Sequence, residues 1–236
     1  VSKIHSDMDI TDLGNRTLVI DLPDDATGNV TVKVGDETYT APVVNGTATV
    51  TLTNTTPGEH EVTVTYSGDG VYHNQTKNAT VVIPKYDTPM DVNAPDSKVG
   101  ETEEIVVTLP DDATGTVTVE VDGKTFSAPV VNGVAKVKVT GLTAGDKTAI
   151  INYSGDDNYE GNYTTANFKV SKNPTTISAS GKDITVGDDE VITVTGLPKD
   201  ATGKVLVEIN GVGYYAKVIN GIARVVVPEL PQGSYT

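Results

Sequence analysis

The sequence predicts an all-β protein built of tandem antiparallel β-sandwich domains, the third of them incomplete. Three observations support this fold class: a motif that returns at an even spacing, apolar residues that alternate with polar ones, and turn dipeptides between the alternating runs. No segment of 10 or more residues carries the apolar stripe of an amphipathic helix. Short alternating runs at regular intervals are typical of all-β domains.

A repeated motif divides the chain of 236 residues into three copies. It reads Leu-Pro-Asp-Asp-Ala-Thr-Gly at 22–28 and 109–115, and Leu-Pro-Lys-Asp-Ala-Thr-Gly at 197–203. The copies start 109 − 22 = 87 and 197 − 109 = 88 residues apart, a period that fits a small domain better than a solenoid repeat. Polar stretches with proline lie between the copies. We therefore expect domains at residues 1–85, 86–172 and 173–236.

Within each repeat, apolar side chains alternate with polar ones, as expected of a strand that buries one face. The first run follows the motif, and its apolar positions are Val30, Val32 and Val34, then Val117, Val119 and Val121, then Val205, Val207 and Ile209. Further runs begin at Ala48, Ala135 and Ala223, at Val62 and Ala149, and at Ala79 and Ala166. We expect Val32, Val119 and Val207 to be equivalent residues in three buried cores.

Glycine-containing dipeptides mark the turns between these runs. Asn-Gly recurs at residues 45, 132 and 220 and is typical of type I′ hairpin turns. In the third repeat Gly233 corresponds to Gly145, and only three residues follow it. We expect this repeat to lack its last two strands. Either the native protein continues for roughly 25 more residues, or another chain supplies the strands through self-association.

The composition excludes several classes of partner and site. A formal net charge of −15 would repel phosphate backbones, so nucleic acid is not an expected partner. The lack of cysteine excludes disulfides, thiolate catalysis and cysteine-ligated metals. No run of 18 apolar residues occurs, so we expect no membrane span. No signal peptide precedes Val1, which suggests an excerpt from a longer precursor.

Three features carry a resemblance to a known family. They are the alternating strand after Asp-Ala-Thr-Gly, the Asn-Gly-x-Ala turn, and Tyr-Ser-Gly-Asp-x-x-Tyr at 66–72 and 153–159. Over its whole length the chain resembles the immunoglobulin-like repeats of prokaryotic surface proteins, above all adhesin-like proteins of methanogenic archaea. The disulfide and core tryptophan of antibody domains are absent.

The resemblance implies an extracellular, non-catalytic stalk or adhesion module on the cell surface. Its partners would be other cells, or glycans and proteins on their surfaces. Two alternatives stay open: one domain is itself a carbohydrate-binding module, or the chain is an accessory segment of a secreted enzyme. An exposed aromatic patch would favour carbohydrate binding, whereas polar, threonine-rich sheet faces would favour a stalk.

No catalytic residue, cofactor site or metal site is predicted. The repeated pairs Asp24-Asp25 and Asp111-Asp112 would suit acid–base chemistry, but the third copy has Lys199-Asp200. We therefore expect these aspartates to cap their own turns. The histidines, which are His5, His60 and His73, show no metal or triad spacing.

Two further motifs have a functional and a structural interpretation. The Ser-Gly-Asp loops at 67–69 and 154–156 carry oxygens for calcium but lack the spacing of an EF-hand loop, so a tight turn is favoured. The tyrosines of the same motif, Tyr66, Tyr72, Tyr153 and Tyr159, would stack on sugars if exposed. Packing at the core or rim of the sandwich is favoured.

Asparagine sequons are the most informative surface feature, because Asn-x-Ser/Thr occurs more often than composition predicts. The sequon asparagines are Asn15, Asn29, Asn45, Asn54, Asn74, Asn78, Asn152 and Asn162. They are predicted N-glycosylation sites. No lysine, asparagine and acid stand out together in apolar surroundings, so an isopeptide cross-link is not predicted.

Overall fold

The computed structural model describes residues 2–236. These residues form 20 β-strands and no helix, which confirms the all-β prediction. All paired strands run antiparallel except β9 and β15, which are parallel. The chain divides into two compact units, residues 1–171 and 172–236. No helix of the described residues is long and apolar enough to cross a membrane.

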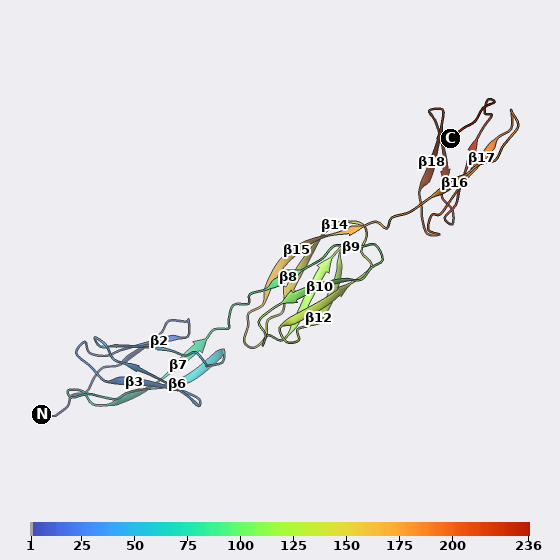
Figure 1. The fold of residues 1–236 in the computed structure, drawn as a ribbon. Helices are drawn as coiled ribbons and strands as arrows, with labels where there is room; N and C mark the ends of the chain where they lie inside the picture. Colours follow the sequence, from blue (N-terminus) through green and yellow to red (C-terminus); the bar gives the residue numbers. More distant parts are fainter. Residues whose placement is uncertain (1) are drawn as a thin grey trace. The chain divides into compact units, whose positions relative to one another are not determined.

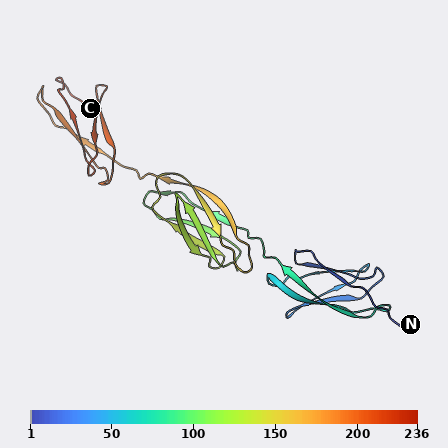
Figure 2. The same cartoon turned by 180° about the vertical axis from the view of Figure 1, so that it is seen from behind.

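The first repeat folds into two sheets that face each other (Figure 1, and from behind in Figure 2). One sheet has the order β1-β2-β5 and consists of β1 (Asp9–Asp12), β2 (Thr17–Asp21) and β5 (Thr47–Thr51). The other has the order β4-β3-β6-β7 and consists of β3 (Asn29–Val34), β4 (Glu37–Pro42), β6 (Gly58–Tyr66) and β7 (Gln75–Ile83).

The second repeat has the same plan with one additional short strand at the edge of its larger sheet. Its smaller sheet, β13-β10-β8, consists of β8 (Asp91–Asn93), β10 (Glu103–Thr108) and β13 (Val134–Val139). Its larger sheet, β12-β11-β14-β15-β9, consists of β9 (Ser97–Lys98), β11 (Thr116–Val121), β12 (Lys124–Pro129), β14 (Gly145–Tyr153) and β15 (Asn162–Ser171).

The period-two alternation explains the cores of these two repeats. Val32 and Val119 are both 0% exposed, as predicted. Val32 is paired with Val64 on β6, and Val119 with Ile151 on β14, so β-branched side chains meet side by side. Each such buried side chain contributes roughly 1.5–3 kcal/mol.

The Asn-Gly turns are tied to the repeated Leu-Pro motif. Asn45 and Asn132 both have a φ of 50°, the left-handed value that a type I′ turn requires. The next residue lies so close to the motif that a Cβ on Gly46 would be 2.6 Å from the Pro23 oxygen. Leu22 N also donates to Gly46 O, at 2.8 Å. The two sequence motifs therefore recur together because they pack on each other.

The third repeat is built of two smaller sheets. They are β16-β17-β20, with β16 (Ser178–Ser180), β17 (Glu190–Thr195) and β20 (Ala223–Val227), and β18-β19, with β18 (Lys204–Ile209) and β19 (Val212–Lys217). No strand follows β20 within residues 2–236.

One prediction for this repeat is wrong. Val207 is only half-buried, not buried like Val32 and Val119. Its strand, β18, pairs with β19 alone, whereas β11 pairs with both β12 and β14. The alternating pattern marks the inward face correctly, but within residues 2–236 no second strand pairs with β18 to cover this end of the core.

Candidate functional sites

The Tyr-Ser-Gly-Asp motif of the first repeat forms a closed hydrogen-bond network. The buried Tyr66 hydroxyl donates to Thr27 O at 2.7 Å and to Asp69 Oδ2 at 3.0 Å. The Asp69 carboxylate also accepts from the backbone N–H groups of Thr27, Val71 and Tyr72, at 2.7–2.8 Å. One carboxylate thus joins the end of β6 to the loop before β3.

The second repeat has the same network at equivalent positions. The Tyr153 hydroxyl donates to Thr114 O at 2.7 Å and to Asp156 Oδ2 at 3.0 Å. Asp156 accepts from the backbone N–H groups of Thr114, Asn158 and Tyr159, at 2.7–2.8 Å. The identical geometry shows that the motif is structural.

These contacts shift the pKa values of the network in opposite directions. Backbone hydrogen bonds, first of all from Thr27, hold the pKa of Asp69 well below its usual range. At Asp156 burial raises the pKa, but the hydrogen bonds from backbone N–H groups outweigh it and lower the pKa to about 2. Burial and the neighbouring Asp69 raise the pKa of Tyr66 to about 12. The aspartates are therefore charged and the tyrosines neutral at physiological pH.

The repeated aspartate pair does not cap its own turn as expected. Asp25 Oδ1 accepts a hydrogen bond from the Tyr72 hydroxyl at 2.6 Å, and Asp112 Oδ1 accepts one from Tyr159 at 2.7 Å. This bond, with burial adding to it, raises the pKa of Tyr159 to about 12. The aspartate thus anchors the second tyrosine of the motif, which is a contact between residues 47 apart in the sequence and not visible in local spacing.

The carboxylates of the two Ser-Gly-Asp loops are not free to bind calcium. In Asp69 and Asp156 the carboxylate oxygens already accept hydrogen bonds from three backbone N–H groups and a hydroxyl. Among residues 2–236 no group of three His, Cys, Asp or Glu side chains could hold a metal ion. The three histidines have different surroundings. The His60 ring contacts Thr56 O at 2.7 Å, while His5 and His73 are exposed.

The tyrosines of the motif pack in the sandwich, as predicted. Tyr66, Tyr72 and Tyr153 are buried, and Tyr159 is half-buried. The large exposed aromatic residues are instead Tyr163 at 76%, Tyr215 at 66% and Tyr86 at 44%. On the outer face of the first repeat, threonine hydroxyls pair across strands, such as Thr31 with Thr40 at 3.2 Å.

All eight sequon asparagines are exposed. Asn15, Asn45, Asn54 and Asn74 lie in turns or loops, whereas the other four lie in strands β3, β7, β14 and β15. Asn162 differs from the rest because its Nδ2 donates to Thr88 O at 2.9 Å and its Oδ1 accepts from Tyr163 N at 2.8 Å. The structure does not bring the eight residues together into one site.

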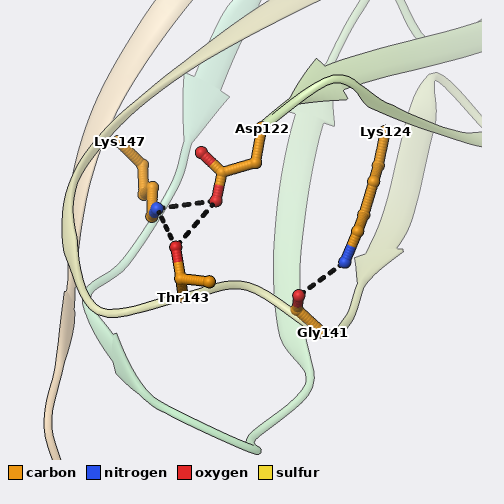
Figure 3. A network of polar contacts seen from close by, with 5 residues as sticks. All are labelled: Asp122, Lys124, Gly141, Thr143 and Lys147. Carbon is orange, nitrogen blue, oxygen red and sulfur yellow. Dashed lines mark hydrogen bonds and ion pairs between the residues drawn. The ribbon is translucent and has the colours of Figure 1, made fainter.

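Sequence reasoning missed an ion pair in the second repeat (Figure 3). Lys147 lies on the inward face of β14, is 7% exposed, and donates to Asp122 Oδ2 at 2.6 Å and to Thr143 Oγ1 at 3.0 Å. The sequence signal for this ion pair was a lysine at a position where the alternation of β14 places inward-facing side chains. The hydrogen bond from Lys147 lowers the pKa of Asp122 and so favours its charged carboxylate form. The third group is a threonine rather than an acid, which fits an ion pair and not a cross-link.

Sequence reasoning also missed a contact in the stretch between the first two repeats. The Arg16 guanidinium lies over the Tyr86 ring and donates to Thr55 O at 2.6 Å and Pro84 O at 2.9 Å. Tyr86 N donates to Asn158 O at 2.8 Å, while Tyr86 O accepts from Glu160 N at 3.0 Å.

The residues on either side of this stretch match one family model, that of the bacterial Ig-like domain (group 3), at residues 13–83 and 91–171. These two matches cover more than half of the chain. The chain belongs to the bacterial Ig-like domain family.

The two bacterial Ig-like matches coincide with the two repeats whose sheets are complete. Tyr86 lies between them, so the Arg16–Tyr86 contact joins one matched segment to the connection that leads into the next. No curated protein matches the chain.

Solved structures with similar folds include other tandem β-sandwich proteins. A bacterial ice-binding adhesin is 20% identical, with 96% of this chain and 88% of that chain covered and a TM-score of 0.33. Invasin, a bacterial integrin-binding protein, is 15% identical, with 97% and 60% covered and a TM-score of 0.48. Domains A168–A170 of titin are 11% identical, with 95% and 88% covered and a TM-score of 0.42.

Proposed function

We propose that this chain is a segment of an extracellular, adhesin-like surface protein and serves as a non-catalytic stalk or adhesion module. The observation that carries the proposal is the bonded connection between its two bacterial Ig-like domains. Both backbone groups of Tyr86 are hydrogen-bonded to the second repeat, and its ring lies under Arg16 of the first. A connection held from both sides suits a spacer that must keep its direction.

The surface chemistry supports the same proposal. The first repeat has a threonine-paired sheet face, and the exposed tyrosines Tyr163 and Tyr215 lie in different units of the chain. No metal-binding group or nucleophile–base pair is part of the proposal. The proposed partners are other cells, or glycans and proteins on their surfaces. We also propose that the protein comes from a methanogenic archaeon. Its domains would span residues 1–85, 86–172 and 173–236.

The stalk is tested by residual dipolar couplings measured on the whole chain. A fixed connection predicts that the first and second repeats share one alignment tensor. The variant Y86G should separate the two tensors, because it removes the ring and adds backbone freedom, while Y163G in β15 should leave them joined. Two unrelated tensors in the unaltered chain would contradict the stalk.

Carbohydrate binding is the second candidate, and the exposed ring of Tyr163 is the observation that favours it. Aromatic rings that project into solvent are suited to stacking on sugars. A glycan array probed with the chain and with Y163S tests this function. Binding that is lost in Y163S supports a carbohydrate-binding module, whereas no binding supports the stalk.

We also propose that the third repeat self-associates through β18, whose second edge has no partner strand within residues 2–236. Unpaired strand edges are templates for pairing with another chain. Sedimentation equilibrium tests this, with a dimer as the expected result. The variant K204P should prevent dimerisation, because proline cannot donate a backbone hydrogen bond to a partner strand. A monomer across the concentration range in the unaltered chain would contradict the proposal.

A further inference from the structure

The outer face of the β18–β19 hairpin differs from the equivalent face of the other two repeats. Strand register places Leu206 beside Tyr215 on this face. At the same distance from the Leu-Pro motif, the first two repeats have a pair of hydroxyl side chains, which are Thr31 with Thr40 and Thr118 with Ser127. The third repeat therefore has an apolar and aromatic pair where its siblings have a polar one.

Packing of the core does not account for Tyr215. The aromatic residue on the inward face of the hairpin is its neighbour Tyr214, which is half-buried like Tyr39 and Phe126 at the equivalent positions of the other repeats. Tyr215 lies on the opposite face and is 66% exposed, and Leu206 is 49% exposed. The two side chains thus form an apolar patch that faces solvent.

Gly213 makes this patch flat. A Cβ on Gly213 would be 2.9 Å from Leu206 Cδ1 and 3.8 Å from Tyr215 Cε2, so both side chains extend over the space that the glycine leaves. The other two repeats have threonine at this position, Thr38 and Thr125. Because the Tyr215 ring leans along β19 towards Gly213, its outer side stays open to solvent. Leu206, Gly213 and Tyr215 are here called the platform.

Two lysines border the platform. Lys204 and Lys217 lie directly opposite each other on the same face, each two residues, or about 7 Å, from the apolar pair. Both are exposed, and among residues 2–236 neither ammonium group has an ion-pair or hydrogen-bond partner. Like charges directly opposite each other destabilise a sheet. An anionic group bound between them would remove this repulsion.

The charge of the third repeat is compatible with an anionic ligand. Residues 172–236 contain six lysine and arginine residues and seven aspartate and glutamate residues, a formal net charge of −1, whereas the whole chain carries −15. On the outer face of the hairpin the two lysines outnumber one acid, Glu208, which lies at the opposite end of the platform. The repulsion expected from the acidic first two repeats is thus weak here.

The size of the platform favours a saccharide over a protein. A stable protein interface buries about 800 Å² on each partner, but only two apolar side chains lie on this face. A pyranose ring has a flat face of C–H groups that matches the open side of one tyrosine ring, and the tyrosine hydroxyl can stay hydrated at the edge.

We propose that the third repeat binds an acidic saccharide on the platform. One sugar ring stacks on Tyr215 and contacts Leu206, and its carboxylate or sulfate group lies between Lys204 and Lys217. The inference rests on the proposed role of the chain as an adhesion module, and it names the class of glycan and the repeat that binds it. It does not involve Tyr163, which lies in the other unit of the chain.

A glycan array with neutral, uronic, sialylated and sulfated saccharides tests the proposal on the full chain. We expect the bound members to be acidic. Methyl esters of the bound carboxylated sugars, which keep the ring and lose the charge, should bind about fivefold more weakly. If no glycan binds, or if acidic and neutral glycans bind equally, the proposal is wrong and the stalk function is unaffected.

The variant L206T/Y215T gives the third repeat the threonine pair that the first repeat accommodates at the same register. Because it removes the stacking surface, it should weaken binding of the best acidic glycan by about tenfold in isothermal titration calorimetry. Its circular dichroism spectrum should match that of the unaltered chain. Unchanged affinity in this variant would overturn the proposal.

The lysines are tested by K204Q/K217Q, which should weaken binding by about fivefold and remove most of its dependence on salt. The matched control is K136Q/K138Q, which lowers the net charge equally at two exposed positions of β13 in the second repeat. This control should bind as the unaltered chain does. An equal loss in both double variants would show that only the overall charge matters, which contradicts a site at the platform.

Two further measurements separate this inference from the other proposals. Binding that is lost in Y163S and kept in L206T/Y215T would overturn the inference but leave carbohydrate binding in place. Sedimentation equilibrium of L206T/Y215T should give the same oligomeric state as the unaltered chain. If this variant loses a dimer and keeps its glycan affinity, the face is an interface between copies of the chain and the inference is wrong.

Discussion

The guanidinium carbon of Arg16 lies 4.0 Å from the centre of the Tyr86 ring. A cation over an aromatic face contributes about 0.5–2 kcal/mol, and the same guanidinium also donates to two backbone carbonyls. Arginine suits this place because its planar fork of donors can bond the carbonyls while its face covers the ring. The contact links the turn before β2 in the first repeat to the segment that pairs with the second.

We expect R16A to lower the free energy of unfolding of the first repeat by about 2 kcal/mol, since it removes a stacked cation and two charge-assisted hydrogen bonds. R16K should restore little of this, because an ammonium group cannot reproduce the fork. Urea denaturation monitored by NMR signals of each repeat measures the effect. Equal stability of R16K and the unaltered chain would contradict the role of the planar group.

Aspartate in place of Val119 should destabilise the second repeat by about 4 kcal/mol or more, because it buries a charge without a partner. The matched variant V207D, at the equivalent but half-buried position of the third repeat, should cost clearly less. Thermal denaturation of both variants decides this. If V207D is as costly as V119D, the third core is more closed than the pairing of β18 indicates.

Acid should weaken the tyrosine–aspartate network. The folded pKa of Asp156 is about 2, below an ordinary value of about 3.9. A lowered folded pKa means that this stabilisation is present above about pH 4 and is lost as the pH falls towards 2. The variant D156N should reduce stability at pH 6 and flatten the loss between these pH values. D157N, at the exposed neighbour, serves as the control in urea titrations at each pH.

Glu103 has the opposite pH dependence. Its Oε1 is buried without a hydrogen-bond partner, and burial raises its pKa. A raised folded pKa means that its contribution is present below about pH 4.3 and is lost as the pH rises through the folded pKa. We expect E103Q to stabilise the second repeat by about 1 kcal/mol at pH 7 and by much less at pH 4. The neighbouring variant E104Q serves as the control, and a destabilised E103Q at pH 7 would contradict the argument.

The Lys147–Asp122 contact should behave as an ion pair and not as a covalent bond. The intact mass of the chain should equal that of its sequence, and a mass lower by one water molecule would reveal an isopeptide. D122N keeps a residue that tolerates the positive φ of this turn, as Asn210 does in the third repeat. It should cost more stability than K147M, because it leaves the more deeply buried charge unpaired.

Much of the fold could be predicted from local pattern. The alternation around Val32 and Val119 assigns the inward faces, and Asn45-Gly46 identifies a turn, because side-chain period and backbone φ preference depend on adjacent residues. The same reasoning failed at Val207, whose pattern is identical. Burial there depends on a neighbouring strand, which lies far away in the sequence.

The sequence by itself determined the repeats, the strands and the eight sequons. Only the tertiary structure decided that Asp25 anchors Tyr72, that Asp122 pairs with Lys147, and that the amide of Asn162 is bonded while that of Asn15 is free. These relationships join residues that are 25 to 74 positions apart. Their chemistry depends on distance and direction in space, which strand register and sheet packing set and no local spacing records.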